Sequence, residues 1–336
     1  MSVTGKGIME KKNESFDSEI SNTADTLTEK RKEADLVFAV VADSHLDDFE
    51  EDTLSNIRAV DRSVKFDFII HLGDFLNGSL SRRYAGRILA EEMERYRMAT
   101  ENGVFYPVQG NHDGFCQIEA DKQVSDMALD EDWYEATEFI HKYANVKRKG
   151  IKPYFYVDYP AQKVRLVILC SFSYEWTEEG AYRKLYQMDS EEIEWLKEEA
   201  LVLESDWTVM LFSHDGPLQL YEETKYDEEP WKGNSKELFQ TVMDSKERCG
   251  YTVAAWFVGH WHGELCRTIQ GIPFVLVGSQ TCYVPQLWNM PEAGHFEKRE
   301  RGTVTQDLWD GAVLNCRKRE LYLCRFGAGK DRVIYY

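Results

Sequence analysis

Residues 104–113 read VFYPVQGNHD, an apolar run that changes abruptly into glycine, asparagine, histidine and aspartate. A short apolar run of this length predicts a buried strand, and a glycine after it allows the backbone to turn or to approach other groups closely. Four other apolar runs, 36–42, 66–72, 207–212 and 253–258, end in the same way. The segments that follow them are Asp43-Ser44-His45, Gly73-Asp74, Ser213-His214-Asp215 and Gly259-His260-Trp261-His262.

Amphipathic segments alternate with the apolar runs, which is typical of an α/β fold. The predicted strands are 36–42, 66–72, 104–108, 154–158, 164–170, 207–212, 253–258 and 274–277, and the predicted helices are 53–63, 81–99, 133–143, 190–203 and 236–249. Two alternating runs near the end, 312–316 and 320–326, predict a β-hairpin. Ligands in open α/β sheets bind beyond the carboxyl ends of the strands, so we expect the five polar segments to meet there.

The domain organisation follows from the change in pattern at residue 36. Residues 1–35 are polar and lack an apolar stripe, which predicts a mobile N-terminal tail or a frayed helix outside the fold. Residues 36–336 are predicted to form one domain that ends in the C-terminal hairpin. The irregular stretches 214–235 and 279–310 are long enough to be functional loops or disordered segments.

Composition excludes several classes of protein. Of the 336 residues, 43% are hydrophobic and the net charge is −19, so we expect a globular protein that repels polyanions such as nucleic acids. The apolar run 36–42 is too short to cross a bilayer, and the first 35 residues lack the apolar core of a signal peptide. Seven cysteines without CxxC spacing are typical of reduced thiols. We therefore expect a cytoplasmic protein without a membrane contact.

The residue types at the strand ends point to metal binding. Imidazole, carboxylate and amide oxygen without thiolate suit manganese, iron, zinc or nickel, and they argue against a structural zinc finger. Asp43 and His45, two positions apart on a segment expected to be extended, can turn toward one ion, and His260 and His262 repeat this spacing. The donors are numerous enough for two ions.

The ordered set DxH, GD, GNHD, a single His after a strand, and GHxH resembles the calcineurin-like metallophosphoesterase superfamily, in particular its bacterial members, over about residues 36–280. The resemblance implies the metallo-dependent phosphatase fold, a four-layer α/β/β/α sandwich of two mixed β-sheets flanked by helices. It also implies roles for named residues: Asp43, His45 and His262 at one metal, Asn111, His214 and His260 at the other, Asp74 as a bridge, and His112 as a catalytic residue oriented by Asp113.

These assignments predict a dinuclear-metal-dependent hydrolase of phosphoesters, either a phosphodiesterase or a phosphomonoesterase, acting on a small or accessible substrate. Two dications about 3.5–4 Å apart lower the pKa of a shared water, which makes a metal-bridging hydroxide available as the nucleophile. A protonated His112 can donate a proton to the departing oxygen. The sequence leaves open the native metal pair, with manganese among the candidates, and the oligomeric state.

Differences between the motifs of this chain and those of known phosphatases narrow the predicted type of phosphoesterase. The residues after Asp74 and the acid in GNHD differ from the usual GDxVDRG and GNHE of protein phosphatases, and Asn77 stands where purple acid phosphatases have a tyrosine. Two alternatives remain: a metal-dependent nuclease, which the acidic composition disfavours, and a catalytically silent scaffold of the same fold, which the complete donor set disfavours.

His71 is predicted to be a core residue, and Asp215 either orients His214 or belongs to a turn.

Overall fold

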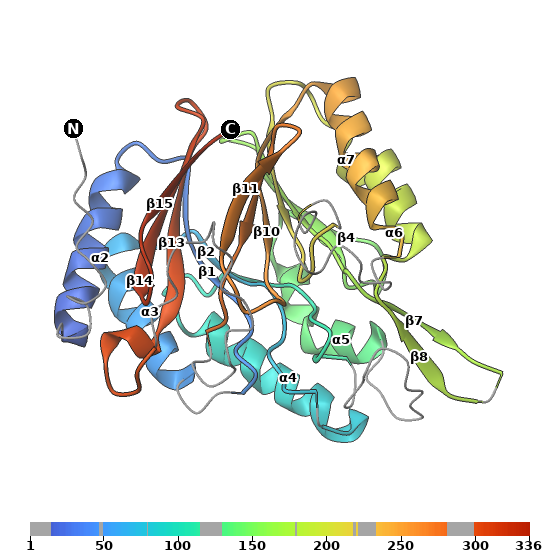
Figure 1. The fold of residues 1–336 in the computed structure, drawn as a ribbon, viewed down its shortest axis with the longest axis horizontal. Helices are drawn as coiled ribbons and strands as arrows, with labels where there is room; N and C mark the ends of the chain where they lie inside the picture. Colours follow the sequence, from blue (N-terminus) through green and yellow to red (C-terminus); the bar gives the residue numbers. More distant parts are fainter. Residues whose placement is uncertain are drawn as a thin grey trace.

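The computed structural model describes residues 15–46, 50–78, 80–114, 130–178, 180–217, 220, 233–280 and 299–336. Two β-sheets stand face to face in the middle of the molecule (Figure 1). The first sheet has six strands in the order β15-β14-β13-β1-β2-β3, and the second has seven in the order β11-β12-β10-β9-β6-β5-β4. Both sheets are mixed. In the first, β1, β2 and β3 are parallel up to one edge and β13, β14 and β15 form antiparallel pairs; in the second, parallel strands β12, β10, β9 and β6 are flanked by antiparallel ones.

The strands of the first sheet are β1 (Leu36–Val41), β2 (Phe68–His71), β3 (Phe105–Pro107), β13 (Leu308–Asn315), β14 (Glu320–Gly327) and β15 (Arg332–Tyr335). Those of the second are β4 (Val146–Arg148), β5 (Phe155–Tyr159), β6 (Val164–Ile168), β9 (Thr208–Phe212), β10 (Thr252–Val258), β11 (Leu265–Ile269) and β12 (Ile272–Leu276). A separate hairpin of β7 (Ser173–Trp176) and β8 (Tyr182–Leu185) extends away from the body (Figure 1).

Helices cover the outer faces of both sheets. They are α2 (Phe16–Arg31), α3 (Glu50–Val64), α4 (Arg82–Arg97), α5 (Asp130–Ala136), α6 (Ser190–Trp195) and α7 (Ser235–Cys249). Figure 1 shows α2 and α3 beside the first sheet and α6 and α7 beside the second. The predicted four-layer α/β/β/α sandwich is therefore confirmed. No helix of the described residues has both the length and the hydropathy needed to span a bilayer.

Aromatic rings from both sheets fill the space between them. Phe38 of β1 stacks on Phe68 of β2 with ring centroids 4.6 Å apart, and its edge meets Phe212 of β9 at 6.3 Å and Phe257 of β10 at 6.2 Å. All six residues of β1 are buried, as expected for a strand covered on both faces. The apolar runs of the sequence thus become strands whose two faces are shielded from water.

The helix α2 corrects the prediction that residues 1–35 are a mobile tail or a frayed helix outside the fold, because the described part packs against the core. Ser15 caps α2 by accepting a hydrogen bond from the Ser18 amide at 3.2 Å. Leu27 is fully buried, and its side chain occupies the space where a Cβ on Gly311 of β13 would lie. The buried face of α2 also contains Glu19 and Thr23, so it has no continuous apolar stripe that the sequence pattern could reveal. Residues 1–14 lie outside the described residues.

Other differences concern segments with weak local signals. The predicted C-terminal hairpin is confirmed as β13 and β14, and it continues the first sheet beside β1. The predicted helix 133–143 is shorter and passes into a 3-10 turn, while 190–203 is α6 followed by one π-turn, Leu196–Ala200. Short strands β4, β7, β8, β11 and β15 were not predicted. The described cysteines are free thiols, which are Cys170, Cys249, Cys266, Cys316 and Cys324.

Replacing Leu27 by alanine tests whether α2 is part of the fold. We expect Leu27→Ala to lower the free energy of unfolding by about 2–5 kcal/mol, because it leaves a cavity against β13. Urea denaturation measures the change, and Thr28→Ala, at an exposed position of the same helix, is the matched control. Equal stability of the two variants would show that α2 does not contribute to the cooperative core.

Candidate metal centre

The five polar segments meet at the carboxyl ends of β1, β2, β3, β9 and β10. Asp43 follows β1 and His260 follows β10, yet the Asp43 carboxylate oxygens accept a hydrogen bond from the His260 amide at 3.1 and 3.2 Å. The two residues are 217 positions apart in the chain. The predicted convergence of the strand ends is therefore confirmed by the geometry.

A first group of donors consists of Asp43, His45 and His262, whose candidate ligand atoms lie within 4.8 Å of one another. The Nε2 atoms of His45 and His262 are 3.0 Å apart, and His262 Nε2 lies 3.5 Å from Asp43 Oδ1. All three side chains are buried or nearly so. This arrangement can hold one cation.

A second group consists of Asp74, His214 and His260, with Asn111 beside it. His214 Nε2 lies 3.2 Å from Asp74 Oδ2, 3.2 Å from His260 Nδ1 and 3.0 Å from Asn111 Oδ1. Asp74 Oδ2 also lies 3.8 Å from Nε2 of His45. One carboxylate oxygen thus stands between the two groups, and the structure brings together all seven residues predicted as metal ligands.

Backbone carbonyls fix which nitrogen of two imidazoles faces the centre. Nδ1 of His214 lies 2.7 Å from the Leu72 carbonyl oxygen, and Nδ1 of His45 lies 3.1 Å from that of Leu76. A carbonyl oxygen only accepts, so each Nδ1 donates, and Nε2 of the neutral ring turns a lone pair toward the centre. Metal-binding histidines commonly show this arrangement.

The converging atoms fit a divalent cation. Asn111 Oδ1, Asp74 Oδ2 and neutral His214 Nε2 are all acceptors, and such a set is stable only with positive charge among them. Burial opposes charge on His214, but the carboxylates of Asp74 and Asp43 outweigh it and raise its pKa to about 9, so a proton supplies this positive charge until a bound metal ion displaces it. Burial lowers the pKa of His45 to about 4, which keeps that ring neutral at pH 7 and able to act as a ligand.

The segments bearing these side chains have a strained backbone. Asp43, His45, Asp74, His260 and His262 all adopt positive φ, between 51° and 70°. The prediction that Asp43 and His45 lie on an extended segment is therefore wrong, because each is in the left-handed region. Such conformations cost of order 1–3 kcal/mol each and cluster at functional sites. With this backbone conformation, side chains two positions apart after a strand, such as Asp43 and His45, can point toward the same place.

Asp113 has different hydrogen-bond partners from the one predicted. Its carboxylate accepts hydrogen bonds from the backbone amides of Gly110 at 2.8 Å, Asp74 at 2.9 Å and Leu76 at 3.0 Å. The prediction that Asp113 orients the His112 ring is wrong, because both carboxylate oxygens are directed to these amides. Asp113 instead ties the loop after β3 to the loop after β2, and so positions Asp74.

His112 stands at the open side of the centre. Its side chain is 40% exposed, its Nε2 lies 3.8 Å from Asp74 Oδ2, and its ring meets that of His45 edge to face at 5.1 Å. The His112 amide donates to Asp74 Oδ1 at 2.8 Å. Gly78 lies against the ring, where a Cβ would come within 2.4 Å of His112 Nδ1. The ring is thus placed next to the centre while still accessible to solvent.

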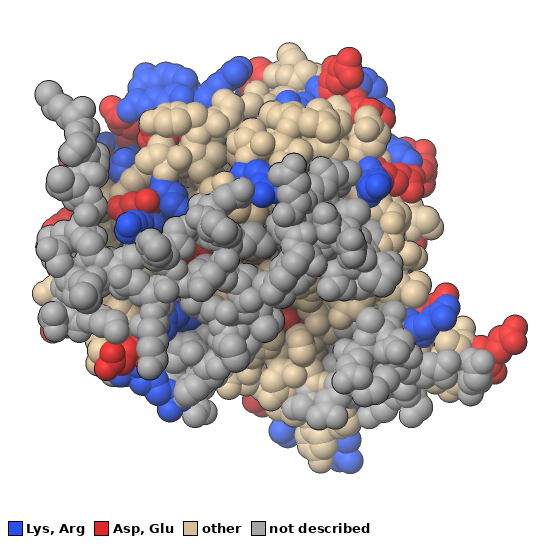
Figure 2. Space-filling model, viewed as in Figure 1, with Lys and Arg blue, Asp and Glu red and all other residues tan. Residues whose placement is uncertain are grey.

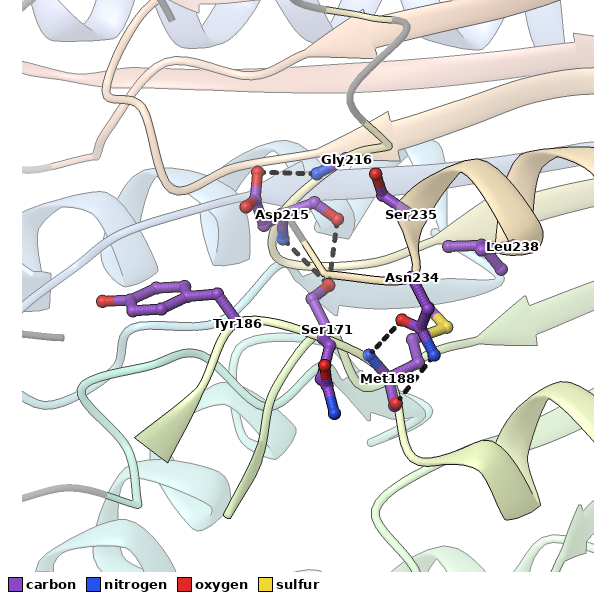
Figure 3. Close-up of a pocket in the computed structure, with 9 residues that line it drawn as sticks. Ser171, Tyr186, Met188, Asp215, Gly216, Asn234, Ser235 and Leu238 are labelled. Atoms are coloured by element: carbon purple, nitrogen blue, oxygen red, sulfur yellow. Dashed lines mark hydrogen bonds between the residues drawn. The ribbon is translucent and has the colours of Figure 1, made fainter. Parts of the chain in front are cut away.

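The structure also places Asp215, whose role the sequence left open, and His71, which was predicted to be a core residue. Asp215 belongs to a turn: its carboxylate accepts from the Gly216 amide at 2.8 Å and from Trp261 Nε1 at 3.1 Å, while its backbone bonds to the Ser171 hydroxyl (Figure 3). His71 is a buried core residue that accepts from the Gly73 amide and bonds to the Ser44 hydroxyl. Burial lowers the pKa of His71 to about 3, so the ring is neutral.

Sequence reasoning missed several groups that hold the centre. The Ser279 hydroxyl donates to the Asp43 carbonyl at 2.8 Å, and the Gln280 amide donates to the Ala42 carbonyl at 2.7 Å. The Leu72 and Leu76 carbonyls, which accept hydrogen bonds from His214 and His45, were also missed. Backbone amides and carbonyls are present at almost every position whatever the residue type, so no sequence signal identifies the ones that hold the centre.

Residues 36–264 match the model of the family described as calcineurin-like phosphoesterase. The chain belongs to this family. No curated protein matches the chain in sequence. Among solved structures, a dimetal phosphatase from Danio rerio is similar at 13% identity and a TM-score of 0.56, over 90% of this chain and 99% of that one. The anchor in the inner membrane complex of Plasmodium has 10% identity and a TM-score of 0.43, over 88% and 89% of the two chains. Membership of the calcineurin-like phosphoesterase family thus accounts for the fold.

Close backbone packing at Gly110 generates a prediction about metal retention. A Cβ at this position would lie 2.1 Å from the Asp74 amide nitrogen and 2.2 Å from Asp74 Oδ1. We expect Gly110→Ala to reduce bound divalent metal at least about tenfold, as measured by elemental analysis of the purified protein. Gly86→Ala, at a helical glycine with room for a methyl group, is the control. Undiminished metal in Gly110→Ala would contradict the placement of Asp74.

Proposed function

We propose that the protein is a dinuclear-metal-dependent hydrolase of phosphoesters. The observation that carries the proposal is the position of Asp74 Oδ2 between two groups of imidazole and carboxylate donors. Asp43, His45 and His262 would hold one ion, and Asn111, His214 and His260 the other. Manganese, iron, zinc or nickel suit this set of nitrogen and oxygen donors.

Two bound divalent ions supply positive charge that neutralises a phosphoryl group and acidifies a water molecule. The chain's own part is to fix the ligands before the substrate arrives. The carbonyls of Leu72 and Leu76 hold two imidazoles in one tautomer, and Asp113 holds the loop that carries Asp74. Donors that need no rearrangement during the reaction lower its barrier more than mobile ones.

His112 is proposed as the acid that protonates the departing oxygen. It lies next to Asp74 but is considerably more exposed, so its Nε2 can face a substrate that enters from solvent. An imidazole is suited to this role because its pKa lies near neutral pH. The edge-to-face contact with His45 and the close approach of Gly78 restrict the ring to one region.

The charges of the protein favour a small phosphoester over a nucleic acid. The net charge is −19, and Figure 2 shows basic and acidic side chains of the described residues side by side around the visible face. Mixed charge of this kind gives little attraction for a polyanion. Monoester and diester substrates both remain within the proposal, and a cytoplasmic location is part of it.

Asp74→Asn tests the proposal. The variant removes the negative charge shared by both donor groups, and we expect kcat/KM for an aryl phosphoester to fall at least about 100-fold in manganese-loaded protein. Asp244→Asn, an exposed residue of α7, is the control. If Asp74→Asn hydrolyses aryl monoesters and diesters as fast as the wild-type protein, the proposed function is wrong.

His112→Asn tests the role of the acid. An alkoxide leaves poorly without a proton, whereas a nitrophenolate leaves well, so we expect kcat to fall about 100-fold or more for an alkyl phosphate and much less for the p-nitrophenyl ester. The asparagine keeps the backbone amide that donates to Asp74. An equal loss with both esters would contradict proton donation by His112.

A further inference from the structure

A cavity lies beside the candidate metal centre, on the other side of Phe172. The ring of Phe172 packs against those of His214 and His260, with centroids 5.7 and 6.0 Å apart. The same residue lines a cavity of about 140 Å³ between the end of β6 and the starts of α5, α6 and β7. An engineered apolar cavity of ~150 Å³ admits benzene, so this space can accept a molecule of about six heavy atoms.

Three buried oxygen atoms on the lining have no hydrogen-bond partner among the described residues. They are Tyr154 Oη, Ser173 Oγ and Glu192 Oε2. The side chains of Tyr154 and Glu192 belong to residues that are each only 1% exposed. Glu192 Oε1 is already engaged, because it accepts from the Cys170 amide at 2.9 Å. Buried polar atoms without partners are rare and costly, so three around one cavity indicate a ligand that satisfies them.

The charge of the lining indicates the sign of that ligand. The carboxyl groups of Asp130, Asp189 and Glu192 face a single cation, Lys152. The Lys152 ammonium lies 3.0 Å from Asp189 and 3.7 Å from Asp130, so it is satisfied without Glu192. Burial raises the pKa of Glu192 well above its usual range, so this carboxyl group keeps its proton until a cation bound beside it favours ionisation.

Aromatic side chains complete the lining and favour an organic cation. Tyr154, Phe172 and Tyr174 all border the cavity. Aromatic faces attract ammonium groups, and the attraction is strongest where water is excluded. A protonated primary amine can donate three hydrogen bonds, which equals the number of unpartnered oxygens. We propose that this cavity binds a small organic ammonium ion, held by Glu192, Tyr154 and Ser173 and covered by the aromatic rings.

The cavity has an accessible side. The side chains of Lys152 and Asp189 are 26% and 39% exposed, whereas Tyr154 and Glu192 form its buried end. An ammonium ion would therefore enter past the Lys152–Asp189 pair and place its charge at the buried carboxyl group. The site is separate from the proposed metal ligands, and its occupation does not depend on the proposed hydrolysis.

The test measures the binding of ethylammonium to the full-length, metal-loaded protein by isothermal titration calorimetry. Ethylammonium is expected to bind saturably with one ion per chain, while ethanol, which has the same size but no charge, and potassium chloride at equal ionic strength give no saturable heat. Glu192→Gln keeps the acceptor for the Cys170 amide, and Tyr154→Phe removes one hydroxyl. We expect each variant to raise the dissociation constant at least about tenfold, since each removes a hydrogen bond to a charged group.

Matched controls separate this site from general effects. Glu94→Gln on α4 and Tyr335→Phe on β15 change exposed residues and should bind ethylammonium as the wild-type protein does. Ser173→Ala, at a residue that is only partly buried, provides a third variant if the two core variants fail to fold. The proposal is wrong if ethanol or potassium chloride gives the same binding as ethylammonium, or if folded Glu192→Gln or Ser173→Ala binds it with wild-type affinity.

Discussion

Two buried carboxylates, Asp43 and Asp74, impose the constraint on which the rest of the centre depends. Their residues are 0% and 1% exposed, and isolated negative charge is costly in such surroundings. The protein compensates with groups from other loops, including the backbone amides of His260 and His112. Each carboxylate therefore holds together segments that are distant in the chain, and the same negative charge makes the site selective for cations.

The sequence predicted the location and composition of the centre because that information is local. An apolar run followed by a polar side chain identifies a strand end, and parallel strands bring their ends to one edge. The conformation of the loops could not be predicted in this way. Asp43 and His45 were expected on extended backbone, yet both are left-handed, because the requirement to point two side chains at one place outweighs local preference. Asp113 shows the same limit: its partners are backbone amides, which every sequence contains.

Outside the centre, prediction failed where the stabilising contact is non-local. The side chain of Leu27 in α2 packs against Gly311, nearly three hundred positions later in the chain. The buried face of α2 also contains polar residues of types that are usually exposed. The cavity behind Phe172 presents the same difficulty. Its lining comes from several elements, and the unpartnered oxygens of Tyr154 and Glu192 acquire meaning only once the fold places them around one space.

The hydrogen bond between Asp43 and the His260 amide closes a loop of more than two hundred residues. It joins the carboxyl end of β1 in one sheet to that of β10 in the other. A cation shared by ligands from both loops would act as a cross-link across this long stretch of chain. Cross-links that close long loops restrict the unfolded chain most strongly in the loop-entropy description. The candidate metal centre would then also link the two sheets of the sandwich, so that chelation would weaken their association.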